Sequence, residues 1–153
     1  MTTRPSTTRN FDYVVYDIDG IKTCSAMTCG SAGSDQCAMD KSWMMIAKRN
    51  DTNYTYFGYY PPLSQNALNL PTNITIDGVA DMRVMPLDGH DETWIVPYTD
   101  QSELLMRALR RGSDLEPTRV TFKTGDFAQR RFRVGDITAI EDYLFETCPT
   151  TIP

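Results

Sequence analysis

The four cysteines restrict the fold of this chain more than any other feature. Cys24, Cys29 and Cys37 lie in one Gly- and Ser-rich stretch, and Cys148 lies near the far end. The chain has no C-x-x-C pair, and its one histidine, His90, is remote from all four cysteines in sequence. A zinc site and a redox-active dithiol are therefore both disfavoured, and we expect no metal and no other cofactor. Structural disulfides are favoured, with four buried thiols as the alternative.

Four cysteines can pair in three ways. We favour Cys29 with Cys37, which closes a short loop, and Cys24 with Cys148, which ties an early strand to the last helix. In the chain-entropy model a link across more than about 100 residues stabilises by up to about 4.7 kcal/mol, against about 3 kcal/mol or less for a short loop. Disulfides persist in oxidising compartments, so we expect a periplasmic or extracellular protein whose signal peptide is absent from this chain.

Short segments rich in β-branched and aromatic residues recur along the chain and are bounded by turn residues. The first, residues 11–18, ends at Asp19-Gly20, a pair that favours a two-residue hairpin turn. Residues 42–47 and 54–60 are predicted to form a hairpin around the charged stretch 48–51. Further strands are predicted at residues 74–76, 82–87, 93–98, 118–124 and 131–134. This regular spacing predicts an antiparallel β-sandwich or barrel.

A first helix is predicted at about 101–111. Its signals are an N-cap at Asp100 with Glu103 completing a capping box, and Gly112 just past its end. The predicted apolar stripe consists of Leu104, Leu105, Ala108 and Leu109.

A second helix is predicted at about 137–148, beginning at Asp136 or at Thr138, the latter with Glu141 as its capping box. Helical spacing puts four residues on one face and turns the last toward the core: Ile137, Ile140, Leu144 and Cys148.

No internal repeat or shift in composition divides the chain, whose 153 residues suit one domain. We expect a flexible N-terminal arm over residues 1–10, a single mostly-β domain over 11–149 and a short tail over 150–153 that packs little. No stretch approaches the roughly 18 apolar residues of a membrane span.

The net charge is −5, but residues 101–135 carry eight Lys and Arg against four Asp and Glu. This basic segment could bind an acidic glycan, a lipid headgroup or an acidic protein, or simply be solvated. Nucleic acid is disfavoured, because the remaining acidic residues would repel phosphate. The basic residues are Arg107, Arg110, Arg111, Arg119, Lys123, Arg130, Arg131 and Arg133, of which Arg107, Arg110, Arg111 and Arg131 are the binding candidates.

The predicted strand 54–60 is rich in tyrosine. Tyr54, Tyr56 and Tyr60 share one face, and Phe57 and Tyr59 share the other. Tyrosine suits an interface because it buries area while keeping a polar tip. We therefore expect one face to be core and the other to be either a binding patch or ordinary sheet surface.

From residue 100 onward the chain resembles the invasion-associated locus B family of bacterial envelope and secreted proteins. The residues that carry the resemblance are 102–112 (SELLMRALRRG), Val120-Thr121-Phe122, and Phe132 to Gly135 before the last helix and Cys148. Residues 28–36 would be an insertion. The resemblance implies a compact β fold with flanking helices, a periplasmic or extracellular location, and no catalytic residues to transfer.

Motifs for catalysis fail on their pattern. His90 with Asp91 and Glu92 suits a polar turn. The stretch 30–34 is neither a G-x-S-x-G elbow nor a phosphate-binding loop. Carboxylates near strand ends could form a glycosidase pair but suit turns equally well: Asp17, Asp19, Asp77, Asp81 and Asp88.

We therefore expect a non-catalytic, disulfide-stabilised binding or interaction domain of the cell envelope or the secreted fraction. Its partner would be a protein or a surface ligand rather than nucleic acid. The alternative is a structural or accessory subunit of a larger assembly, such as a virion or a cell-envelope complex, since the polar N-terminal arm would suit contacts with neighbouring subunits.

Overall fold

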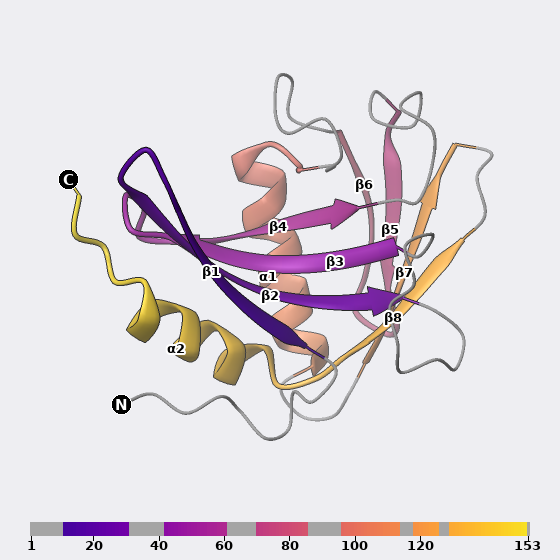
Figure 1. The fold of residues 1–153 in the computed structure, drawn as a ribbon. Helices are drawn as coiled ribbons and strands as arrows, with labels where there is room; N and C mark the ends of the chain where they lie inside the picture. The colour runs from indigo at the N-terminus through magenta and orange to yellow at the C-terminus, as the bar shows by residue number, and fades with distance from the viewer. Residues whose placement is uncertain are drawn as a thin grey trace.

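A computed structural model describes residues 11–30, 42–60, 70–85, 96–113, 118–125 and 129–152. Two four-stranded antiparallel sheets and two helices make up this part of the chain (Figure 1). The mostly-β fold with two short helices is confirmed, and of the two architectures considered the sandwich is the one formed.

Sheet A is a meander with the strand order β1-β2-β3-β4. The turn between its first two strands places Asp19 at φ 53° and Gly20 at φ 83°, the left-handed geometry of a type I′ hairpin turn. The hairpin predicted from the Asp-Gly pair is thus confirmed. Strand β2 is longer than expected, because its ten residues extend into the cysteine-rich stretch. The strands are β1 (Asp12–Ile18), β2 (Ile21–Gly30), β3 (Ser42–Arg49) and β4 (Thr55–Tyr60).

Sheet B has the strand order β6-β5-β7-β8. Its strands agree with the predicted segments to within a few residues, and β7 agrees at both ends. The segment predicted as a strand at 93–98 is described only from residue 96, where Pro97 makes an isolated bridge and a helix follows at once. The strands are β5 (Thr72–Ile76), β6 (Ala80–Val84), β7 (Thr118–Thr124) and β8 (Arg130–Val134).

Helix α1 (Thr99–Ser113) is longer at both ends than predicted. Asp100 lies inside its first turn rather than at the N-cap, so the predicted capping box is wrong. Leu104 does not belong to the apolar stripe, since it is 53% exposed, and Met106 is buried beside Leu105 instead.

Gly112 lies within α1 and does not end it. A Cβ atom at this position would lie 3.1 Å from Val79 and 3.2 Å from Ile76. The missing side chain therefore lets the end of α1 approach sheet B closely, which is a packing role rather than a capping role.

Helix α2 (Ile137–Thr147) begins after Asp136, one of the two predicted starts. Its four predicted inward residues are all buried, so the apolar stripe is confirmed. Glu141 is no capping residue. Its buried carboxylate accepts hydrogen bonds from Thr55 Oγ1 at 2.6 Å and Arg110 Nη2 at 2.7 Å, which ties α2 to β4 and α1.

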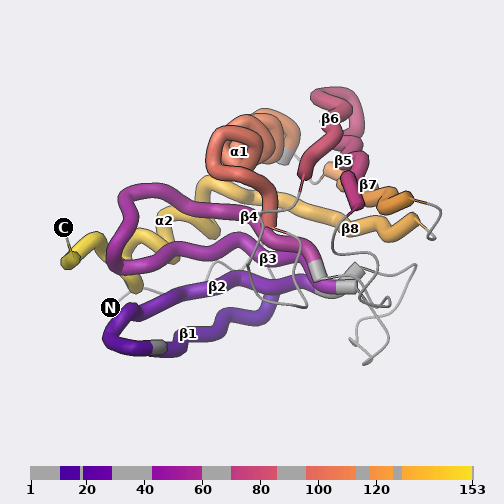
Figure 2. Tube along the Cα trace, turned by 90° about the horizontal axis from the view of Figure 1, so that it is seen from above, coloured from indigo at the N-terminus to yellow at the C-terminus, as the bar shows by residue number. Residues whose placement is uncertain are grey.

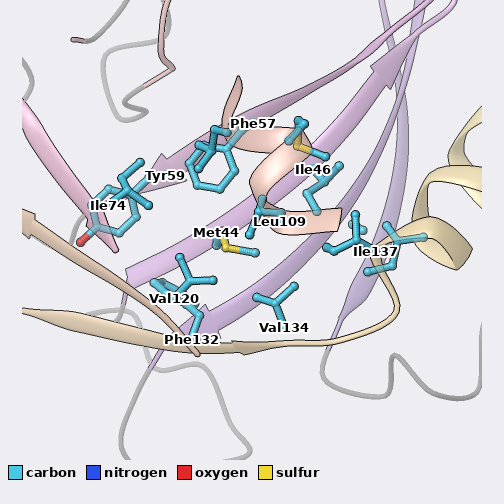
Figure 3. Close-up of a cluster of buried hydrophobic side chains, with 14 of the residues drawn as sticks. Met44, Ile46, Phe57, Tyr59, Ile74, Leu109, Val120, Phe132, Val134 and Ile137 are labelled. Carbon is cyan, nitrogen blue, oxygen red and sulfur yellow. The ribbon is translucent and has the colours of Figure 1, made fainter. Parts of the chain in front are cut away.

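The core lies between the two sheets and is closed by the helices (Figure 3). Aromatic rings form its centre, where Tyr59 stacks on Phe122 with ring centroids 4.4 Å apart and Phe132 meets Phe122 edge-on at 5.2 Å. Phe57 and Tyr59 are buried, so the face that these two residues were predicted to share is the core face.

The C-terminal end of α2 is fixed to sheet A. A disulfide joins Cys24 on β2 to Cys148, which confirms that predicted bond. The other predicted bond, between Cys29 and Cys37, lies outside the described side chains.

Lys48 was predicted to lie in a charged turn, but β3 continues through it and its side chain is fully buried. Its Nζ donates to the carbonyl oxygens of Arg49 at 2.6 Å and Cys148 at 2.9 Å, and to Thr150 Oγ1 at 3.2 Å. The tail beyond α2 also packs more than expected, because the N–H groups of Thr151 and Ile152 donate to the Asn50 carbonyl.

Candidate functional site

Tyrosines gather on the face of sheet A that points away from the core. Tyr16 from β1 is 39% exposed and Tyr54, just before β4, is 37% exposed, while Tyr56 on β4 is half-buried. We call Val14, Tyr16, Arg49, Tyr54 and Tyr56 the tyrosine surface. The side chain of Tyr60 lies outside the described side chains, so its predicted place on this face is not described.

Polar contacts hold the tyrosine surface in one arrangement. Tyr16 lies close enough to Tyr56 to raise the pKa of its hydroxyl, although their strands are not neighbours in the sheet. Arg49 is held by Asp51 through two hydrogen bonds, Nε to Oδ1 at 2.8 Å and Nη2 to Oδ2 at 2.6 Å. That contact lowers the pKa of Asp51 and raises the pKa of Arg49. The guanidinium of Arg49 is therefore held in place before any partner binds.

Burial raises the pKa of Tyr56 above the ordinary value of 10.0, and the neighbouring Tyr16 adds to this rise. Above pH 10 the unfolded chain loses this proton while the folded chain keeps it, so stability falls as the pH rises. We expect Tyr56→Phe to remove this loss, which amounts to about 1.4 kcal/mol between pH 9 and 11. Urea unfolding of both proteins at the two pH values measures this loss of unfolding free energy. An equal loss in the wild type and in Tyr56→Phe would contradict the burial of this hydroxyl.

The edge of β1 is open within the described part of the chain. Figure 2 shows β1 on the side of sheet A farthest from α1. Val14, Val15 and Tyr16 are 42%, 49% and 39% exposed. The type I′ turn and the register, which pairs Ile18 with Ile21, imply that Val15 and Asp17 direct their backbone N–H and C=O groups away from β2. Lys22, the partner of Asp17 in the register, likewise directs its backbone away from the strand pair. Its N–H donates to Asn50 Oδ1, and its carbonyl accepts from the Asn50 N–H.

The other three sheet edges carry features that block strand addition. On β4 the outward N–H of Phe57 donates to Ser102 Oγ of α1 at 3.2 Å. Just after β6, the N–H of Met85 donates to Gln101 Oε1 at 2.9 Å. Strand β8 carries three arginines in five residues, and charge on an edge discourages pairing.

The outer face of sheet B is strongly basic. Arg119 on β7 lies directly opposite Arg133 on β8, and Arg83 and Arg131 are exposed on the same face. We define the basic face, from the register, as Asn73, Thr75, Asp81, Arg83, Arg119, Thr121, Lys123, Arg131 and Arg133.

The predicted arginine candidates separate in space. Arg131 lies on the basic face, and Arg107 and Arg111 are exposed on α1. Arg110 is on the same helix, but it is half-buried and its guanidinium pairs with the buried Glu141.

The candidate acids that the structure describes lie in two separate pairs on different sheets. Asp17 and Asp19 lie at the turn of the first hairpin, where Asp17 Oδ1 accepts from the Gly20 N–H at 3.1 Å. Asp77 and Asp81 lie on the other sheet, and Asp81 accepts from Thr75. His90 and Asp88 lie outside the described residues. Among the described residues, no cluster of metal-ligating side chains occurs and no helix is long and apolar enough to cross a membrane.

Sequence reasoning missed two parts of these surfaces. The tyrosine surface includes Val14 and Tyr16, and the basic face includes Arg83, which lies far from the basic segment in sequence. The Asp19-Gly20 turn was a local signal for the position of Tyr16, because it fixes the register that puts Tyr16 opposite Thr23.

No family model, curated protein or solved structure matches this chain. The resemblance to the invasion-associated locus B family therefore stays a prediction.

Proposed function

We propose that the protein is a non-catalytic interaction domain of an oxidising compartment, and that it binds protein partners by strand pairing at β1 beside the tyrosine surface. The observation that carries this proposal is the edge of β1, where three adjacent apolar or aromatic side chains are exposed. The disulfide supports the oxidising compartment. The resemblance to envelope and secreted proteins agrees with it.

The backbone supports strand pairing. Proteins normally protect long edge strands with Pro, Lys, bulges or covering elements. β1 has seven residues, DYVVYDI, without Pro or Lys, and pairs with β2 without a bulge. An added strand would bond to the outward backbone groups of Val15 and Asp17, which is the mode known as β-augmentation.

The side chains support a protein partner. Tyrosine and arginine are enriched at the centres of protein interfaces. The half-burial of Tyr56 and the Asp51 pair of Arg49 restrict the rotamers of these side chains before binding, which reduces the entropy lost in a complex.

A second candidate is a symmetric assembly of this chain, favoured by the self-complementarity of β1. In an antiparallel pairing centred on Tyr16, Val15 of one copy would lie opposite Asp17 of the other. In each of these Val15–Asp17 pairs, the outward N–H and C=O groups of one residue would bond to those of the other. Tyr16 would face its own mate as an aromatic cross-strand pair, and no two aspartates would be opposed.

One experiment distinguishes these functions. A photo-activatable phenylalanine analogue at Tyr16 is compared with the same analogue at Leu104, an exposed position on α1, in extracts of the source cells. We expect a discrete adduct from position 16 and none from position 104. An adduct of twice the chain mass supports the assembly, and one of another mass supports a separate partner. Equal labelling from both positions would refute the interface.

Hydrogen exchange provides an independent measure of strand pairing. In the complex, the amides of Val15 and Asp17 should gain protection, because they point outward. Those of Val14 and Tyr16 should change little, since they already bond to β2. Uniform protection along β1 would contradict pairing at this edge.

A further inference from the structure

The basic face of sheet B carries an arrangement that costs stability. Arg119 and Arg133 are directly opposed on neighbouring strands, and like charges in that position repel. Both side chains are exposed, and neither makes an ion pair with a described residue. Arg83 and Arg131 add two more exposed cations without such a pair. A bound anion would remove this repulsion.

We propose that the basic face binds a linear anionic polysaccharide through its sulfate or carboxylate groups. The four arginines lie over a sheet whose strands are about 4.8 Å apart, so they span about 14 Å from β6 to β8. That width suits several anionic groups along one chain better than a single small anion. Guanidinium forks bind such oxyanions with two parallel hydrogen bonds.

Neutral polar side chains make a polysaccharide the best match among polyanions. Asn73 lies between Arg83 and Lys123 across the strands, Thr75 lies beside Thr121, and Thr121 lies between Arg119 and Lys123 along β7. Their hydroxyl and amide groups can bond to sugar hydroxyls. The single acid of the face, Asp81, accepts from Thr75 Oγ1 at 3.1 Å and lies on the edge strand β6, away from the Arg119 pair.

The same residues disfavour other polyanions. Single-stranded nucleic acid is bound by stacking its bases on aromatic rings, and the basic face as defined contains none. A bilayer surface is bound by inserting apolar side chains, and the face contains none of these either. The proposal is independent of the tyrosine surface, which lies on the other sheet.

Heparin, a linear sulfated polysaccharide, is the probe for the test. Its affinity for the wild-type protein is compared with that for Arg119→Gln/Arg133→Gln and for the control Arg107→Gln/Arg111→Gln. The control removes the same charge from exposed positions on α1. We expect the Arg119/Arg133 variant to bind at least about tenfold more weakly and the control to stay within about twofold of wild type. Binding should also weaken by about tenfold or more when the salt rises from about 50 to 200 mM.

The variants also report on folding. Because the Arg119/Arg133 change removes a repulsion, its melting temperature should equal or exceed that of the wild type. Equal loss of heparin binding in both double variants would mean simple ion exchange and would overturn the site. Tighter binding of a single-stranded oligonucleotide or of anionic phospholipid vesicles than of heparin would overturn the choice of polysaccharide. Absence of heparin binding by the wild-type protein at about 50 mM salt would overturn the proposal as a whole.

Discussion

Replacing Cys24 and Cys148 together by alanine is expected to lower the free energy of unfolding by about 5 kcal/mol. The two residues are 124 positions apart, so their bond closes a very long loop in the unfolded chain. The chain-entropy model gives a stabilisation of that size for such a loop. For a domain of this length the melting temperature should fall by roughly 10–20 °C. Denaturant unfolding of both proteins in oxidising buffer measures the difference.

Two controls accompany this measurement. Cys29→Ser/Cys37→Ser removes the other two cysteines and should cost less, because a bond between them would close only a short loop. A reductant should destabilise the wild-type protein. It should not change the stability of a variant that combines Cys24→Ala/Cys148→Ala with Cys29→Ser/Cys37→Ser, because no cysteine remains. A loss below about 1 kcal/mol would show that the unfolded chain is already compact around this link.

The parts of the fold that the sequence predicted depend on local patterns. Asp19-Gly20 determined the first turn because a type I′ turn needs left-handed backbone at both positions. The apolar spacing along α2 identified its buried face and turned Cys148 inward. The alternation from Tyr54 to Tyr60 separated the core residues Phe57 and Tyr59 from the outward Tyr56.

The predictions that failed depend on contacts between distant segments. Lys48 sits in a charged run that suggests a turn, but the carbonyl that stabilises it belongs to Cys148, 100 residues away. Gly112 looks like a helix end, yet its missing side chain serves packing against Ile76 and Val79. Glu141 looks like a capping residue, yet its partners lie on other elements. No local pattern carries this information.

The candidate surfaces were predictable only in part for the same reason. Charge counted along the chain places Arg110 and Arg131 in one basic segment, whereas the fold pairs Arg110 with Glu141 and leaves Arg131 exposed. The register of sheet B then brings Arg83 onto the basic face. Pairing between strands, rather than composition, therefore decides which charges act together.

Replacing Lys48 by alanine is the other change for which we expect a large effect. The fully buried stem of this lysine packs beside the end of α2, and its ammonium donates to the Cys148 carbonyl and to Thr150. Truncation would leave a cavity and remove these bonds at the negative end of the helix dipole. We expect the free energy of unfolding at pH 7 to fall by about 3–5 kcal/mol.

Two further variants separate packing from hydrogen bonding. Lys48→Met keeps an apolar stem of similar length. It also removes a buried charge, whose unfavourable desolvation is seen in the lowered pKa of Lys48. The free energy of unfolding should therefore fall by only about 1–2 kcal/mol. Lys22 donates to the Thr147 carbonyl at the same helix end but is only half-buried. Lys22→Met should therefore cost less than about 1 kcal/mol. Equal losses for Lys48→Ala and Lys48→Met would place the whole effect in the hydrogen bonds, and equal losses for Lys48→Met and Lys22→Met would show that burial of the ammonium does not matter.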